Sequence, residues 1–441
     1  MHQRALRLAA LAVLAFFLGA APAETVDNSN FATILALVHD GQFDAAARRA
    51  RASAGSSDLP SAFLDAFLDY WRLLYDDKNA TLQAAFDKRL TRTISLAQAR
   101  LDKNPKDGEA AVLGGTAHVL RAQLLGRQKK AVAAANEAKR GRRILLTTQD
   151  PDALFGLGSY NYSIDQLQGA ARSLRAVMGI PGGDRDEGLR QLERAAREGH
   201  RFGLEARLLL MSIYVGKREH QLDEAWRQAE RLEREHGDAV VALDAAARTA
   251  LLSGRADQAA QWLDRALKES AGADAAVTST MRLQRGRCEL ARFRPDKALE
   301  WLAPLLSNPS LLPAGQRDEL REAATAARAL PPAPADGDAA LKLAQERPED
   351  AVAALHAGRA LVLAGRAQEA LPLLTRAERS GRIPDPWLGP SRLLAGQAAD
   401  LLGQRTAALD WYKKALDSPD WVGKEAPRRW LERPYRGPAS S

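Results

Sequence analysis

The residue types that most often do chemistry in proteins are few in this sequence and are widely spaced. The single cysteine, Cys288, cannot build a cysteine zinc site, and we expect it to be a small buried apolar residue. No two histidines stand three or four residues apart, and none belongs to an H-E-x-x-H element. We therefore expect no metal site and no cofactor, and we expect each histidine to be a surface or helix-end group. The histidines are His2, His39, His118, His200, His220, His236 and His356.

Phosphate-binding loops and nucleophile motifs are missing as well. Gly156-Leu157-Gly158 has no third glycine, and Gly182-Gly183 lacks the Lys and Ser/Thr that accompany a phosphate-binding loop. The G-x-S-x-G elbow of serine hydrolases does not occur. Carboxylate pairs are common on any charged helix surface, so none can be singled out as an acid–base pair. The sequence therefore predicts a protein that is not an enzyme.

An aromatic group, Phe155, Tyr160 and Tyr162, precedes an irregular stretch over residues 163–181. These side chains either line a pocket together with that stretch or pack against it as core. We expect Phe155 and Tyr162 to be core, and the pocket remains the alternative for residues 155–186.

The composition favours helices and argues against nucleic acid as a partner. Ala, Leu, Arg, Glu and Gln are abundant, and runs of alternating β-branched residues are essentially absent. The formal net charge of +8 is mild for 441 residues, Lys-rich runs are missing, and acids and bases alternate along residues 187–201. We therefore expect an all-α protein that is stabilised by apolar packing and not by disulfides.

Three segments repeat one spacing of small and large residues. Each has a glycine, an alanine five residues later, a large apolar residue four further on, and a second alanine after three more. Glycine permits the positive φ that ends a helix, and alanines seven apart lie on one helical face where two helices can approach closely. A further small residue stands seven positions before each glycine. These positions are Ala247, Gly254, Ala259 and Ala266; Gly358, Gly365, Ala370 and Ala377; and Gly396, Gly403, Ala408 and Ala415.

This pattern resembles the tetratricopeptide repeat, a two-helix unit of about 34 residues. The resemblance implies a right-handed superhelical solenoid of about eight or nine helix pairs over residues 28–420, elongated and with contacts only between neighbouring pairs. One degenerate unit would lie around residues 315–348. The turn-side alanine recurs at Ala225, Ala259, Ala298, Ala370 and Ala408.

A second resemblance covers roughly residues 90–240. It rests on residues 150–162 (DPDALFGLGSYNY), 179–188 (GIPGGDRDEG) and 205–214 (EARLLLMSIY). These segments are similar to tetratricopeptide proteins of the bacterial cell envelope that are distantly similar to the eukaryotic inclusion-body-clearance family. Such proteins are helical interaction proteins, so the resemblance supplies no catalytic residue.

The first residues have the pattern of a secretory signal. Arg4 and Arg7 precede an uncharged apolar run over residues 8–18, and small residues follow up to Ala23. We expect cleavage after Ala23, a mature chain that begins at Glu24, and a location in the periplasm or outside a Gram-negative cell. The alternative is an N-terminal membrane anchor, for which the apolar run is short. We expect no transmembrane span in the mature chain.

Proline and glycine divide the rest of the chain. A Pro-rich break is expected between a longer N-terminal array and a shorter C-terminal one. After the last repeat, Trp421 and Trp430 are expected to cap the helices before the chain frays. The predicted segments are the signal peptide (1–23), the N-terminal helical array (24–330), the Pro-rich break (331–337), the C-terminal repeats (338–420) and the capping segment with a frayed tail (421–441).

In this repeat family the first helix of each pair lines an inner, concave groove. The residue that follows the small residue seven positions before each turn residue would project into this groove, and these residues are mostly basic. The pattern therefore predicts a ladder of basic side chains. Arginine suits carboxylates because its planar fork donates two parallel hydrogen bonds. The chain is rich in arginine, so coincidence is the alternative. The predicted ladder is Arg248, Arg287, Arg359 and Gln397.

The sequence therefore predicts an exported protein–protein interaction scaffold. It would bind a protein or peptide partner in its concave groove, and the partner would present carboxylates from acidic side chains or a C-terminus. The alternative is a regulatory or substrate-presenting helical subunit that works with a separate envelope-processing enzyme, and an intrinsic enzyme comes third. Identifying the envelope proteins that co-purify with it would separate the first two.

Overall fold

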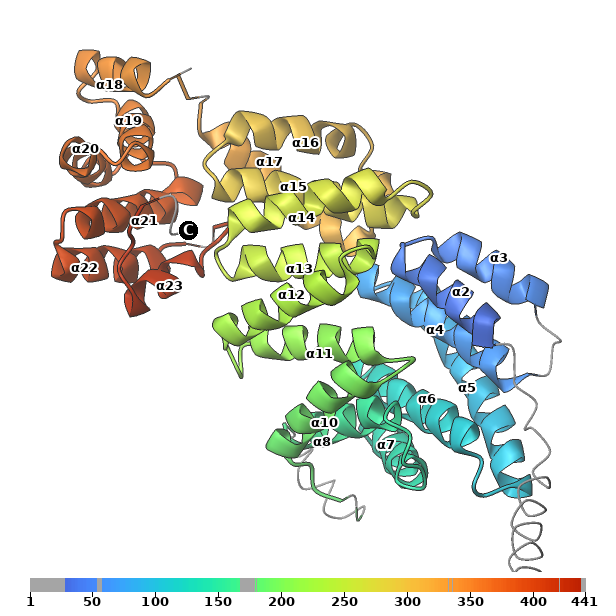
Figure 1. Cartoon of the computed structure of the whole chain (residues 1–441). Coiled ribbons are helices and arrows are strands. Elements are labelled where there is room, and N and C mark those ends of the chain that lie inside the picture. The colour runs from blue at the N-terminus through green and yellow to red at the C-terminus, as the bar shows by residue number, and fades with distance from the viewer. Residues whose placement is uncertain are drawn as a thin grey trace, which may run out of the picture.

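The protein is all-α over the part of the chain that the computed structural model describes, which comprises residues 28–53, 58–166, 179, 181–331, 333–334, 336–419 and 421–437. These ranges hold 21 α-helices and no strand, which confirms the predicted fold class (Figure 1). The predicted signal segment, residues 1–23, lies outside them. No helix of the described ranges is long and apolar enough to cross a membrane.

The helices fall into two arrays on either side of the predicted Pro-rich break. The N-terminal array comprises α2 (Asn28–His39), α3 (Phe43–Ser53), α4 (Leu59–Tyr75), α5 (Ala80–Lys103), α6 (Gly108–Arg127), α7 (Ala131–Leu145), α8 (Ala153–Asp165), α10 (Arg185–Glu198), α11 (Gly203–Val215), α12 (Leu222–His236), α13 (Val240–Leu252), α14 (Ala256–Glu269), α15 (Ala275–Ala291), α16 (Pro295–Ser307) and α17 (Arg317–Ala329), with two short 3-10 turns at Pro309–Leu311 and Ala314–Gln316. The C-terminal array comprises α18 (Gly337–Glu346), α19 (Ala351–Leu363), α20 (Ala367–Arg379), α21 (Asp385–Leu401), α22 (Arg405–Leu416) and α23 (Ala426–Glu432).

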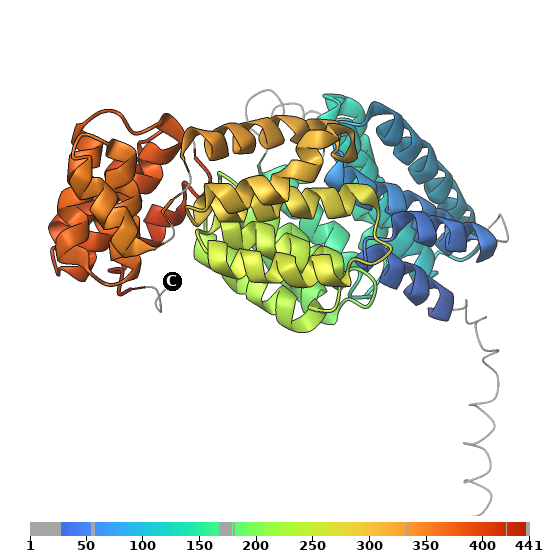
Figure 2. The same ribbon diagram turned by 90° about the horizontal axis from the view of Figure 1, so that it is seen from above.

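Successive helices pack as pairs, and within each array each pair stacks on the next, as in a tetratricopeptide-like solenoid (Figures 1 and 2). In the described ranges these pairs are α2/α3, α4/α5, α6/α7, α8/α10, α11/α12, α13/α14, α15/α16, α19/α20 and α21/α22, and α23 packs on α22.

The turn glycines show why the repeated spacing forms helix pairs. Gly254, Gly365 and Gly403 have φ angles of +73°, +73° and +71°, in the left-handed region that side chains disfavour. The residue after each glycine donates its backbone N–H back across the helix end, as Arg255 does to the carbonyl oxygen of Ala250 at 2.8 Å. This bond satisfies a carbonyl of the last helical turn and reverses the chain into the second helix.

The small residues let the paired helices approach closely. Ala259, Ala370 and Ala408 are fully buried. A Cβ on Gly358 would lie 2.5 Å from Cγ of Leu374, and one on Gly396 would overlap the ring of Tyr412. At these two positions the large apolar residue of the second helix therefore occupies the space that a side chain on the first would need.

The expected degenerate unit around residues 315–348 does not form a helix pair. α17 packs on α15 and α16, whereas α18 packs on α19. The chain between the two helices holds Pro331 and Pro334, and proline favours extended backbone and cannot continue the helical hydrogen bonding. The would-be pair is therefore divided between the two arrays.

The N-terminal array also curls back on itself, so its contacts are not confined to neighbouring pairs as predicted. α2 contacts α13, and α4 contacts α15. The Tyr75 hydroxyl at the end of α4 donates to the Asp244 carboxylate at 3.0 Å, and the Gln316 side-chain amide donates to the Tyr75 carbonyl at 3.2 Å. The backbone N–H of Asp274 donates to the carbonyl of Gly41 at 2.9 Å. The first helices therefore cover part of the face that α13 and α15 were expected to leave open.

Candidate binding cavity between the two arrays

Arg248, the first residue of the predicted ladder, is engaged within the fold. Its guanidinium lies 2.8 Å from the Asp244 carboxylate one helical turn away, and 5.5 Å from the centre of the Tyr75 ring. Asp244 is fully buried, and burial raises the pKa of its carboxyl. Arg248 therefore compensates a buried acid at the contact between α4 and α13, and it is not free to meet a partner.

Arg287 is also paired to this chain. Its guanidinium lies 2.6 Å from the Glu319 carboxylate of α17 and 3.3 Å from the side-chain oxygen of Gln284. The same Glu319 acts electrostatically on Arg248. Arg248 and Arg287 are thus both ion-paired with carboxylates of the N-terminal array.

Arg359 lies in a different environment. It donates to the backbone carbonyl of Arg292 at 3.2 Å, and no carboxylate of the described ranges pairs with it. Burial, together with the nearby Arg294 and Arg292, lowers the pKa of Arg359 to about 10. The three arginines therefore differ in their partners: Arg248 and Arg287 are paired with acids of the N-terminal array, whereas Arg359 is not paired with a carboxylate of the described ranges.

Arg359 and Gln397 come together in a cavity of about 310 Å³ between the two arrays. The N-terminal array contributes the α13–α14 and α15–α16 turns, and the C-terminal array contributes α19, α21 and the segment around α23. The basic side chains that line it are Arg292, Arg294, Arg359 and Arg429, and the acid is Asp257. The large apolar side chains are Leu251, Phe293, Leu363, Leu393, Leu394, Trp421, Trp430 and Tyr435.

The cavity has a cationic side. Asp257 lies 2.7 Å from the guanidinium of Arg292, which also lies 2.9 Å from Glu289. Arg429 stacks on Trp430 with its guanidinium carbon 4.5 Å from the ring centre. Burial and the nearby Arg255 and Arg433 lower the pKa of Arg429 to about 10. Positive charge on Arg359 and Arg429 is thus held beside apolar walls, where electrostatic interactions are stronger than in water.

Contacts between the arrays hold the cavity together. The Trp387 indole N–H of α21 donates to the carbonyl of Ala326 in α17 at 2.8 Å. His220, in the turn before α12, lies 3.2 Å from the Glu425 carboxylate that precedes α23. Phe293 packs on Trp387 with ring centres 5.4 Å apart.

The repeated spacing of small and large residues, here called the repeat register, could not predict this cavity. It identifies the face on which Arg359 and Gln397 lie, but not the segment that covers them. Trp421 and Trp430 were predicted only to cap the last helices. They and Arg429 line the cavity, and the available signal was the clustering of tryptophan and arginine over residues 421–436.

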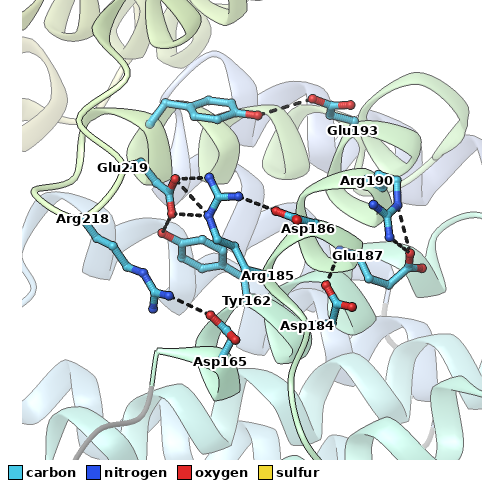
Figure 3. A network of polar contacts seen from close by, with 11 residues as sticks. Tyr162, Asp165, Asp184, Arg185, Asp186, Glu187, Arg190, Glu193, Arg218 and Glu219 are labelled. Carbon is cyan, nitrogen blue, oxygen red and sulfur yellow. Dashed lines mark hydrogen bonds and ion pairs between the residues drawn. The ribbon is translucent and has the colours of Figure 1, made fainter.

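The aromatic group of α8 belongs to the core. Phe155 packs on Phe202 with ring centres 5.5 Å apart, and both Tyr160 and Tyr162 are buried. The Tyr162 hydroxyl donates to Glu219 at 3.2 Å, and Glu219 also accepts several hydrogen bonds from Arg185 (Figure 3). Most of the adjoining stretch, including residues 167–178, lies outside the described ranges, so this group forms a structural network with α10 as far as the structure describes it.

Two expectations about single residues have different outcomes. Cys288 is fully buried, as expected, and burial raises the pKa of its thiol to about 12. His118 and His356 do not lie at the surface or at a helix end. His118 is buried in the middle of α6 with Nδ1 2.6 Å from Glu137, and His356 is buried within α19 with Nε2 2.9 Å from the carbonyl oxygen of Pro331. Over the described ranges no group of three or more His, Cys, Asp or Glu side chains could hold a metal ion.

No protein-family model matches this sequence, and no curated protein is similar to it. Solved helical structures align with it at low identity. Yeast Tom70 aligns over 86% of this chain and 64% of its own, with a TM-score of 0.37 and 10% identity, so this chain spans less than two thirds of that protein. A Rap protein complexed with competence and sporulation factor aligns over 92% and 93%, with a TM-score of 0.29 and 12% identity. A human IFIT1 dimer with m7Gppp-AAAA aligns over 87% and 88%, with a TM-score of 0.31 and 12% identity. The repeat architecture is therefore assigned from the turns and the packing of this chain itself.

Proposed function

We propose that this chain is an exported, non-catalytic helical-repeat scaffold that binds a protein partner in the cavity between its two arrays. The observation that carries the proposal is Arg359, a charged side chain without a carboxylate partner in the described ranges, placed with Gln397 among apolar walls. Sites of this composition, mostly apolar with a few polar groups, are typical of ligand-binding cavities.

The rest of the predicted inner surface supports this location. Arg248 and Arg287 are held by Asp244 and Glu319, and Tyr75 at the end of α4 lies against Arg248. Of the three predicted arginines, Arg359 is therefore the one without a carboxylate partner in the described ranges. Export is supported by the sequence of residues 1–23 alone.

Site-directed photocrosslinking of the full-length protein in its own cells would test this function. Leu363 lines the cavity and is 49% exposed, so a photoreactive phenylalanine analogue there should crosslink the partner. Val132 of α7 is 53% exposed and does not line the cavity, so it provides a matched control. We expect one defined protein adduct from position 363 that is missing from position 132. No adduct at position 363, or the same adducts from both positions, would contradict the proposal.

A further inference from the structure

The charge balance of the cavity leaves room for one additional carboxylate. Asp257 is ion-paired with Arg292, which also pairs with Glu289. Arg359 has no such pair in the described ranges and points its charge into a space that already contains Arg294. A bound carboxylate would neutralise it through the two-pronged geometry that guanidinium groups favour.

Apolar surface adjoins this charge. Phe293 of the α15–α16 turn, Leu394 of α21, and Trp421 and Trp430 of the C-terminal segment line the same cavity as Arg359. An occupant that covers these side chains must carry an apolar group, since a polar group there would lose its water without gaining a hydrogen bond.

The charge of Arg359 and the apolar side chains line one small cavity, and this restricts the chemistry of the occupant. In a polypeptide, an apolar side chain and a carboxylate are attached to the same carbon only at the C-terminal residue. An Asp or Glu side chain carries its carboxylate without an apolar group of its own. The Gln397 amide, which can both donate and accept, is suited to the last peptide group of such a chain end.

The size of the cavity agrees with a chain end. Its volume of about 310 Å³ is at the lower limit of the roughly 300–1,000 Å³ that is usual for ligand sites. It therefore takes the last residues of a chain and not a whole helix. Asp257 is already paired with Arg292, so the charge left to match at Arg359 is a single positive one, which suits a carboxylate better than a phosphate dianion.

We propose that this cavity captures the C-terminus of a partner polypeptide, with the free carboxylate on Arg359 and an apolar last side chain against Phe293 and Trp430. The proposal rests on the proposed function and names the part of the partner that is bound. Such an occupant contacts both arrays at once, so binding would also strengthen their docking.

Calorimetric titration of the purified full-length protein would test this with defined peptides. The probe is N-acetyl-Ala-Ala-Leu with a free carboxylate. Its C-terminal amide has the same apolar side chain without the charge, and N-acetyl-Ala-Ala-Asp amide has only a side-chain carboxylate. We expect the free acid to bind at least tenfold more tightly than either of the other two. Inorganic phosphate should not compete with it.

Variants assign the effect to the cavity. Arg359→Gln should remove the preference for the free acid, whereas Arg287→Gln, which alters an arginine outside the cavity, should leave it unchanged. Arg359→Lys keeps the charge but loses the planar fork, so it should retain a reduced preference. Circular dichroism and urea unfolding would show that each variant is folded.

The possible failures are distinguishable. Equal binding of acid and amide, an unchanged preference in Arg359→Gln, competition by phosphate, or no binding of any peptide would overturn the C-terminus proposal. A position-specific adduct at residue 363 would still support partner binding in each of these cases. If that adduct forms and the free acid abolishes it, both proposals are supported.

Discussion

Gly254 and Ala426 lie so close together that a Cβ on Gly254 would be 2.5 Å from the Cα of Ala426. Gly254 is also the turn residue between α13 and α14, with φ at +73°. One glycine therefore has two roles, because it reverses the chain within a repeat and makes room for α23 of the other array. Its counterparts Gly365 and Gly403 have nearly the same φ and no neighbouring atom within 4 Å of such a Cβ.

We predict that Gly254→Ala destabilises the protein more than Gly365→Ala does. Both substitutions force alanine into the left-handed region, which costs about 1–2 kcal/mol. Only Gly254→Ala adds the clash with α23, which should cost roughly a further 1–3 kcal/mol or loosen the docking of the arrays. Urea unfolding measures the first effect, and small-angle scattering detects the second. Equal losses with unchanged scattering would show that the contact with Ala426 is not needed for docking.

Much of the repeat packing could be predicted from sequence because its causes are local. A glycine at a helix end and alanines seven apart restrict the backbone within a few residues of themselves, so Gly365, Ala370 and Ala377 define a turn and a packing face without further information. The contacts that build the cavity are not local. Gly254 lies against Ala426, and the Arg248 guanidinium lies over the Tyr75 ring, because helices far apart in the sequence pack together.

The same reasoning explains why the partners of the three ladder arginines could not be predicted from the repeat spacing. The repeat register predicts the face of a helix on which a side chain lies. It does not predict whether α4 returns to cover that face, or whether α17 supplies Glu319 to pair with Arg287. Those outcomes depend on how the whole array curls.

We predict that Ala370→Leu destabilises the protein by about 1–3 kcal/mol through overpacking. Ala370 is fully buried on the face of α20 that packs against α19. Gln368→Leu adds a leucine on the exposed side of the same helix and serves as the control, with an expected change within about 0.5 kcal/mol. Urea unfolding of both variants would test the packing, and a neutral Ala370→Leu would mean that the helix interface tolerates extra volume.

The Glu219 network predicts a particular pH dependence. Hydrogen bonding to Arg185 holds the pKa of Glu219 below its ordinary value of 4.5. The ionised group therefore stabilises the folded state above pH 4.5, and that contribution is lost as the pH falls through the lower, folded-state pKa. We expect Glu219→Gln to cost about 1.5–3 kcal/mol at pH 7 and progressively less below pH 4.5.

Urea unfolding of the wild type and the variant between pH 3 and 7 would measure this difference. Glu187→Gln is a suitable control, since Glu187 pairs with the exposed Arg190 on the surface of the same region, and such pairs contribute about 0–1 kcal/mol. A gap between wild type and Glu219→Gln that does not narrow in acid would show that the network is not held by the charge of Glu219.

Export predicts a mature chain that begins at Glu24. The basic residues, the apolar run and the small residues up to Ala23 fit a signal peptidase site. N-terminal sequencing of the protein recovered from outside the inner membrane would determine its first residue. Ala23→Lys should block cleavage and leave the precursor intact. A wild-type protein that keeps Met1 would contradict both the cleavage and the proposed location.

The last prediction is that the three arginines of the predicted ladder differ in stability when each is changed to alanine. Arg248→Ala leaves the buried Asp244 without its cation and with only the Tyr75 hydroxyl as a partner, which should cost about 2–3 kcal/mol. Arg287→Ala breaks a partly exposed pair with Glu319 and should cost roughly 0–1 kcal/mol. Arg359→Ala removes one hydrogen bond to the Arg292 carbonyl but also the repulsion from Arg294 and Arg292, so we expect a loss of no more than about 1 kcal/mol. Urea unfolding at pH 7 measures all three, and a small effect shared by all three would mean that Arg248 does not compensate the buried charge of Asp244.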